Sequence, residues 1–498
     1  MATYVLLQDD PAENLNKDID TQAIELQVHP KVQDDAKALE IHEAPREARL
    51  TRHSNNSIWQ IATVYEPDTL EDEYELAGPE HGYSNVTSAS ASVLSGSVNL
   101  ANTILGTGML AMPSAIASVG IIPGILLILL CGTASGCGLY FLTQAARHIP
   151  GRNASFFAVS QVTYPKAAIF FDLAIAIKCF GVAISYLIII SDLMPQVAHS
   201  LFFISLDSGS ILVAGRFWLT IFMLLIVVPL SFLRKLDSLK YTSIIALFAV
   251  VYLIAIVIWN SIGPSTPTDT ASEVNIARFS SKIFTSLPVL IFAFTCHQNM
   301  FTVYNELSDN SQPMVNKVIQ ASIGSAVCIY ETIGILGYIA FGNAVRPNVI
   351  VEYPVSIFIT VGRLAIVIMV LFSYPLQAHP CRASLDKVLS YRKHSVESAT
   401  KVPTAPSQVK WFWTTTGILV FSYLIAMFGL ELDIVLSFVG STGSTIISFV
   451  LPGLFYYKLQ ENQPMTKSKA IAIGLACYGM IVMIVCLAFN IRRVVIKQ

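Results

Sequence analysis

The chain has 498 residues, of which 54% are hydrophobic and 13% are charged, with a formal net charge of −2 and a mean hydropathy of +0.60. Because soluble domains carry roughly 25% charged residues, this composition excludes an ordinary soluble protein and indicates a membrane protein. The net charge says nothing about partners, since the charges are segregated along the chain. We expect a lipid bilayer and no nucleic acid around this protein.

Residues 1–91 are polar and acidic, as in the run EPDTLEDEYE at residues 66–75. They show no amphipathic period, and a segment with few apolar residues cannot bury enough surface to fold by itself. We therefore expect a disordered acidic tail in the cytosol, where a cytosolic partner could bind. Residues 92–491 follow as one membrane domain, and residues 492–498 as a short C-terminal tail.

Eleven apolar runs of roughly 20 residues, the length that crosses a bilayer core, follow the tail. They predict an all-α polytopic membrane protein with eleven transmembrane helices and short loops. The runs lie near residues 93–119, 122–143, 168–194, 216–233, 241–262, 283–303, 316–341, 355–377, 412–430, 433–456 and 470–490.

The orientation of these spans is predicted from the Lys and Arg residues of the loops. The loops of one side carry sixteen of them and the loops of the other side carry four. Because positive charge marks the cytosolic side, the N-terminus is predicted to be cytosolic. Arg492, Arg493 and Lys497 would fall on the opposite side and are the one discordant group.

The first span contains a predicted break. Its sequence VNLANTILGTGMLAMP (residues 98–113) places amides and glycines in mid-membrane, and Gly106-Thr107-Gly108 stands directly before a second half-helix. An unwound backbone is tolerated at this depth only where protein or a water-filled cavity satisfies its hydrogen bonds. Close packing of the span against other helices is the alternative interpretation, since small residues and amides also hold membrane helices together.

Unwinding at this break would leave free N–H groups on Met109 and its neighbours, at the positive end of the second half-helix. Such an end is a ready site for a substrate carboxylate, and carbonyls freed before the break could meet an ammonium or a small cation. The predicted substrate-binding residues of this span are Asn102, Thr103, Gly106, Thr107, Gly108 and Met109.

A second break is predicted in PVLIFAFTCHQNMFTVYNE (residues 288–306), which sets Thr295 and His297 in mid-membrane. Two interrupted spans, each opening a set of about five, indicate a transporter with its site at the midplane. We therefore assign both residues to the substrate site. His297 is either a neutral histidine satisfied by a backbone carbonyl or a proton-responsive gate, since histidine titrates nearest physiological pH.

Three ionisable residues lie within spans. Lys178 would cost about 2.5–3.5 kcal/mol at the bilayer centre and should face the protein interior. Glu331 is a candidate proton carrier, and for both residues a structural ion pair is the alternative to a transport role. Lys178 and Asp192 are about 21 Å apart along one helix and cannot pair directly. Arg363 is expected near the trans surface, where its side chain can snorkel.

These segments resemble the amino acid/auxin permease family. The resemblance is strongest to the fungal vacuolar amino-acid transporters and more distant to the animal sodium-coupled neutral amino-acid transporters. It implies a LeuT-like inverted-repeat fold in which helices 1 and 6 are broken and spans 1–5 and 6–10 form the two halves. It covers residues from about 92 to 490 and rests on NLANTILGTGMLAMP (99–113), KCFGVAISYLIIISDLMPQ (178–196), FAFTCHQNMFTVYNEL (292–307) and FSYPLQAHPCR (372–382).

The resemblance also implies a coupling-ion site. Asn102 and Ser373 fall where the animal relatives place their sodium-site asparagine and hydroxyl residue. Those relatives carry threonine at the second position and a long, disulfide-bearing loop before span 6, which here is only residues 263–281, without cysteine. A proton is therefore expected as the coupling ion in place of sodium, and the candidate coupling residues are Asn102, Ser373, Glu331 and Lys178.

The sequence and the resemblance together predict a proton-linked amino-acid transporter of the vacuolar, lysosome-like membrane. It would export amino acids to the cytosol, neutral ones such as glutamine being favoured. A plasma-membrane amino-acid permease and a non-transporting amino-acid sensor, which signals through the acidic tail, are the alternatives. The sequence has no nucleotide-binding loop, no metal-ligand cluster at a fixed spacing and no Ser/His/Asp arrangement, so we expect no enzyme, no cofactor and no metal.

Overall fold

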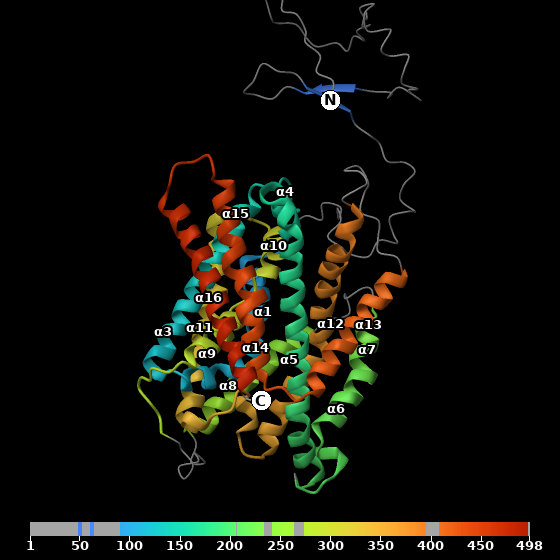
Figure 1. Cartoon of the computed structure of the whole chain (residues 1–498), viewed down its shortest axis with the longest axis vertical. Helices are drawn as coiled ribbons and strands as arrows, with labels where there is room; N and C mark the ends of the chain where they lie inside the picture. Colours follow the sequence, from blue (N-terminus) through green and yellow to red (C-terminus); the bar gives the residue numbers. More distant parts are fainter. Residues whose placement is uncertain are drawn as a thin grey trace, which may run out of the picture. The chain divides into compact units, whose positions relative to one another are not determined.

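The computed structural model describes residues 48–51, 60–63, 90–205, 207–233, 242–262, 273–394 and 408–496 (Figure 1). Contacts divide the chain into two units, residues 1–76 and residues 77–498. In the first unit, β1 (Ala48–Thr51) and β2 (Gln60–Thr63) form an antiparallel pair. These eight residues depart from the expected lack of structure. The rest of the tail up to residue 89 lies outside the described residues, so its disorder stays a prediction.

Helices lie at all eleven apolar runs that the sequence predicts, because each run is long and apolar enough to hold one. In chain order the helical segments are α1 (Val93–Ile104), η3 (Thr107–Ala111), α2 (Met112–Ala117), α3 (Ile121–Ala146), α4 (Phe156–Thr163), η4 (Pro165–Ala167), α5 (Ala168–Phe202), η5 (Ile211–Val213), α6 (Gly215–Phe222), η6 (Met223–Val227), α7 (Val228–Ser231), α8 (Thr242–Ile262), α9 (Ile283–Ala293), α10 (His297–Glu306), α11 (Gln312–Phe341), η8 (Gly342–Ala344), η9 (Val349–Val351), α12 (Ile357–His394), α13 (Gln408–Met427), α14 (Leu432–Val439), η10 (Gly440–Ser444), η11 (Ile446–Val450), α15 (Leu451–Leu459) and α16 (Lys467–Ile496).

Within the described residues, seven helical stretches are long and apolar enough to cross a membrane. α1 and the stretch from Thr107 to Ala117 pass the same test as a pair, bent by 49° between them. The second unit is therefore an all-helical protein of the membrane type, as predicted. The seven stretches are Ile121–Ala146, Pro165–Phe202, Gln312–Ala344, Ile357–Ser390, Gln408–Met427, Leu432–Leu459 and Lys467–Ile496.

The long helix α5 runs through the middle of the second unit and packs most extensively against α12 (Figure 1). Glycines allow its other neighbours to come close. A Cβ atom on Gly181 would lie 2.0 Å from Val439 of α14, and one on Gly443 would lie 2.6 Å from the Ala174 carbonyl oxygen. Gly443 belongs to the π-helical turn η10, which thus packs directly on α5 beside Lys178.

Arg363 of α12 is fully buried. Its guanidinium donates hydrogen bonds to the carbonyl oxygens of Ile350 at 3.2 Å and Tyr353 at 2.7 Å. The expectation that this side chain snorkels to the membrane surface is therefore wrong. The segment between η8 and α12 folds over the arginine and supplies acceptors for Nε and one terminal nitrogen, which lowers the cost of burying the charge.

Candidate functional site

α1 stops at Ile104 because Gly106, Thr107 and Gly108 follow, and glycine weakens a helix interior. The chain makes a tight turn, in which the Gly106 N–H donates to the Ile104 carbonyl at 2.8 Å. The Met109 N–H donates to the Gly106 carbonyl at 3.2 Å, so the prediction that it is free is wrong. The bond from Met109 to Gly106 is the first hydrogen bond of the short helix η3. The N–H groups of Thr107 and Gly108, which precede Met109, are therefore the donors left without a helical partner at the N-terminus of η3.

The second break separates α9, which ends at Ala293, from α10, which begins at His297. Phe294 and Thr295 still donate their N–H groups to carbonyls of the last turn of α9. The Phe294 carbonyl, which no longer belongs to a helix, accepts a hydrogen bond from the Ser135 hydroxyl of α3 at 2.9 Å. The neighbouring helix α3 thus supports the interrupted backbone.

The two breaks lie directly against each other. A Cβ atom on Gly108 would be 2.7 Å from the Cβ of Ala293, closer than van der Waals contact allows. The flanking helices are joined as well, since the Asn299 amide of α10 donates to the Thr103 hydroxyl of α1 at 2.8 Å. Two segments almost 200 residues apart in the sequence therefore form one site.

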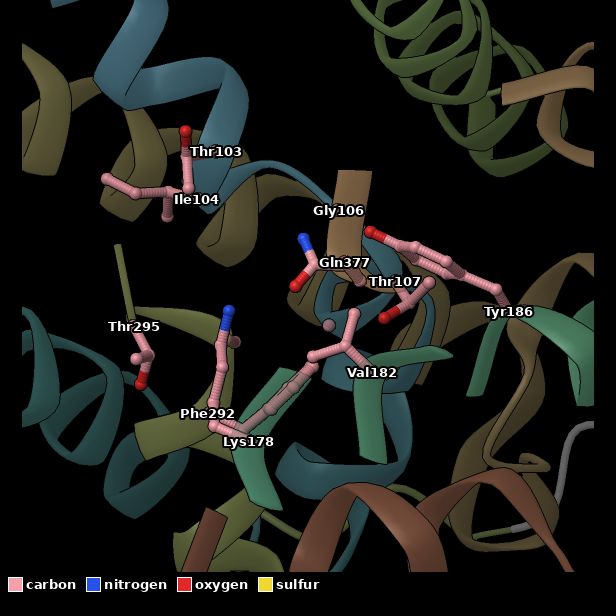
Figure 2. A pocket seen from close by; sticks show the side chains of 12 residues that line it. Thr103, Ile104, Gly106, Thr107, Lys178, Val182, Tyr186, Phe292, Thr295 and Gln377 are labelled. Atoms are coloured by element: carbon pink, nitrogen blue, oxygen red, sulfur yellow. The ribbon is translucent and has the colours of Figure 1, made fainter. Parts of the chain in front are cut away.

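A cavity of about 30 Å³ lies at this junction, closed on its other sides by α5 and α12 (Figure 2). Lys178 is buried and is the one charged residue among those that line it. Figure 2 shows Lys178 and Gln377 pointing into this space, with the Tyr186 hydroxyl directed toward Gln377. The lining residues are Thr103, Ile104, Gly106, Thr107, Gly108, Lys178, Val182, Tyr186, Phe292, Ala293, Thr295 and Gln377.

The chemistry of this lining suits a small ligand with a negative pole. Lys178 forms no salt bridge with any described residue, so its ammonium offers an uncompensated positive charge. The open end of η3 adds N–H donors, and the Thr107 side chain adds a hydroxyl. A cavity of this size admits roughly one or two water molecules, so a larger ligand requires its walls to move apart.

The structure brings together more than half of the predicted site residues. Those that line the cavity are Thr103, Gly106, Thr107, Gly108, Thr295 and Lys178. Those outside its lining are Asn102, Met109, His297, Ser373 and Glu331.

The residues outside the lining lie in different surroundings. His297 is fully buried beside Gly138 of α3 and interacts with the backbone of Ser135. Glu331 is half-buried, and one oxygen of its carboxyl group is buried without a partner in the described part of the chain. The same holds for the amide oxygen of Asn102. No described hydrogen bond joins Asn102 to Ser373, so their common ion site stays a prediction.

The sequence did not predict the contributions of Val182, Tyr186 and Gln377. Val182 and Tyr186 follow Lys178 on one face of α5 at helical spacing, so this stripe was a usable signal. Ser185, which lies between them in the sequence, donates its hydroxyl to the Val182 carbonyl at 2.8 Å within the helix. Gln377 lies one turn after Ser373 on α12, inside the motif FSYPLQAHPCR (372–382), from which only Ser373 was assigned a role.

Comparisons with known proteins identify the family of this chain. Vacuolar amino acid transporter 5 of Schizosaccharomyces pombe is 42% identical over 83% of this chain and 99% of its own length. Sodium-coupled neutral amino acid symporter 2 of Danio rerio is 25% identical over 76% of this chain and 77% of its own length. The crystal structure of MhsT in complex with L-phenylalanine superimposes with a TM-score of 0.51 at 13% identity, covering 79% of this chain and 97% of that one.

The likeness to MhsT concerns the fold alone and is of the LeuT-like kind that the sequence resemblance implies. The relatives are transporters, and not enzymes, as predicted. The model of the family described as "Transmembrane amino acid transporter protein" matches residues 89–492. The chain therefore belongs to the transmembrane amino acid transporter family.

Proposed function

We propose that this chain is a secondary active amino-acid transporter of the vacuolar membrane, linked to protons, that exports neutral amino acids such as glutamine to the cytosol. Family membership and the name of the S. pombe relative, a vacuolar amino acid transporter, support the substrate class and the compartment. The coupling ion, the direction and the preference for glutamine are the parts of the proposal that experiments must test.

The proposal includes eleven spans and a cytosolic N-terminus. Besides the seven long stretches and the bent first pair, the shorter apolar helices Gly215–Ser231 and Ile245–Ser261 and the α9–α10 pair complete this number. Arg493, which belongs to the discordant group, pairs with Asp433 at 2.7 Å and Glu431 at 3.0 Å. A charge cluster this late in the chain need not control the topology.

The observation that carries the proposal is the cavity between the two helix breaks. An amino acid presents a carboxylate and an ammonium, and both need partners when water is stripped away. In the proposal, the N–H groups of Thr107 and Gly108 bind the carboxylate at the positive end of the half-helix. The buried ammonium of Lys178 acts as a fixed positive charge in the place of a coupling ion.

Proton coupling requires a group that binds and releases a proton between lumen and cytosol. Glu331 and His297 are the candidates: one carboxyl oxygen of Glu331 is buried without a partner among the described residues, and His297 is a fully buried histidine next to the second helix break. Serine at position 373 and the short segment before α9 distinguish this chain from the pattern of the sodium-coupled relatives, which favours the proton.

The test is uptake and efflux of each common amino acid in isolated vacuoles, with and without a proton gradient. We expect efflux of neutral amino acids that responds to the gradient, and a fluorescent fusion located at the vacuolar membrane. A fusion at the cell surface would favour the plasma-membrane permease. Absence of net flux together with ligand-dependent binding by the tail would favour the sensor.

A further inference from the structure

The hydroxyl of Tyr330, on α11, lies between the ends of the two broken helices. It is 2.6 Å from the carbonyl oxygen of Ile104, the last residue of α1, and 2.9 Å from that of Ala293, the last residue of α9. Tyr330 is fully buried, and its ring packs edge-on against Phe294 with centroids 5.1 Å apart. Both acceptor residues line the cavity.

One phenolic proton therefore faces two carbonyl oxygens, and it is shared between them as a three-centre hydrogen bond. The two acceptors stand at helix C-termini, which carry partial negative charge. Carbonyls at the ends of interrupted helices, aimed at one point, are the donor set with which a membrane protein holds a small hard cation. Here the neutral hydroxyl of Tyr330 occupies the position where such a cation would lie.

We propose that Tyr330 is a positioning residue that stands in for a coupling cation between the two helix breaks. Its proton offsets the facing carbonyls of Ile104 and Ala293, and thereby keeps both breaks aligned around the cavity with no alkali ion between them. This inference rests on the proposed amino-acid transport and deepens it by adding to Lys178 a second residue that takes the place of a coupling cation.

The location of Tyr330 fits this role. Gly108 and Ala293 already touch, so a small change in the separation of the two helix ends alters the width of the cavity. The Ile104 carbonyl also accepts the Gly106 N–H at 2.8 Å, within the turn that precedes the N–H donors of η3. The hydroxyl is therefore connected through one turn to the groups that are proposed to bind the substrate carboxylate.

The experiment measures amino-acid uptake into proteoliposomes that hold wild type, Tyr330→Phe or Tyr338→Phe, in sodium, lithium, potassium or choline chloride. Tyr330→Phe removes only the hydroxyl and keeps the ring against Phe294. Tyr338→Phe is the matched control, because Tyr338 is a fully buried tyrosine of the same helix that does not line the cavity. Its hydroxyl accepts a hydrogen bond from the Asn275 N–H at 2.8 Å and donates one to the amide oxygen of Asn343 at 2.9 Å.

We expect wild type and Tyr338→Phe to transport equally in all four salts. Tyr330→Phe should lose about tenfold in choline, the equivalent of one buried hydrogen bond, and regain much of that loss in sodium or lithium. Sodium should also raise the melting temperature of the purified Tyr330→Phe variant and not that of wild type. If Tyr330→Phe does not reach the membrane, Tyr330→Met removes the same hydroxyl with a more adaptable side chain.

Loss of uptake in Tyr330→Phe that no cation restores would overturn the proposal, and so would wild-type uptake that sodium stimulates. Full activity of Tyr330→Phe in choline would overturn it as well. The proposed amino-acid transport fails by a different result, the absence of uptake by the wild-type protein in all four salts, so the two failures are distinguishable.

Discussion

Gly108 of η3 and Ala293, the last residue of α9, lie directly against each other. A Cβ atom on Gly108 would lie 2.7 Å from the Cβ and 2.9 Å from the Cα of Ala293, whereas one on Gly106 would meet nothing within 4 Å. The two glycines of this turn therefore have different structural roles. Gly108 permits contact between backbones, and Gly106 leaves open space at the cavity that it lines.

Gly108→Val should abolish nearly all transport, and Gly108→Ala should lower the free energy of unfolding by about 1–3 kcal/mol, the usual effect of overpacking. Because the obstacle is the backbone of Ala293, a rotamer change cannot relieve it. Gly106→Ala should instead keep the melting temperature and raise KM, since its methyl group enters the cavity.

The matched control for these variants is Gly324→Ala, because Gly324 is an exposed glycine of α11 whose added Cβ would meet nothing within 4 Å. Melting temperature in detergent and uptake into proteoliposomes, measured for all variants, separate packing from binding. Wild-type uptake by Gly108→Val would refute the role of this contact.

The sequence predicted the helices well and the lining of the site only in part. Long apolar runs determine helix positions because the bilayer requires them. Glycines and amides mark the places where α1 and α9 end, because an interrupted backbone needs polar partners at this depth. The hydrogen bond from Met109 to Gly106 depends on the residue at which η3 starts, which composition does not reveal. Arg363 was misjudged because its acceptors come from a loop that folds back over α12.

Lys178→Met should abolish transport while making the protein more stable. The Lys178 ammonium is buried with no salt bridge to a described residue, and such a charge costs about 2.5 kcal/mol or more inside a membrane protein. Its removal should raise the free energy of unfolding by a similar amount. Transport should be lost, because the cavity then has no positive charge for the substrate carboxylate. Thermal unfolding and uptake, measured for wild type and Lys178→Met, test whether stability rises while transport is lost.

Lys166→Met serves as the control for Lys178→Met, because Lys166 is exposed in the short turn η4 that precedes α5. We expect its uptake and melting temperature to match wild type. A Lys178→Met protein that transports normally would remove the fixed charge from the mechanism. One that melts earlier would show that Lys178 has a stabilising partner when the protein is folded.

Asn102→Ala and Ser373→Ala should weaken stimulation by the coupling ion more than they weaken exchange of labelled for unlabelled substrate. Neither residue lines the cavity, and the buried amide oxygen of Asn102 has no partner among the described residues. Exchange returns the coupling ion with the substrate, so it depends less on ion affinity than net flux does. Equal losses in both assays would assign the two residues to substrate binding or to packing.

Transport should depend on lumenal pH through Glu331 or His297. A group that takes up a proton from the acidic lumen and releases it to the cytosol makes efflux rise as lumenal pH falls. We expect this rise in wild-type vesicles when lumenal pH is varied from about 7.5 to 5.

Glu331→Gln or His297→Gln should flatten that pH profile and leave exchange largely intact, because glutamine keeps polar atoms at the site and cannot titrate. The two side chains are separable, since His297 is fully buried beside Gly138 whereas Glu331 is half-buried. The variant that flattens the profile therefore identifies the proton carrier. An unchanged profile in both variants would mean that the proton moves through other groups or that the protein is a uniporter.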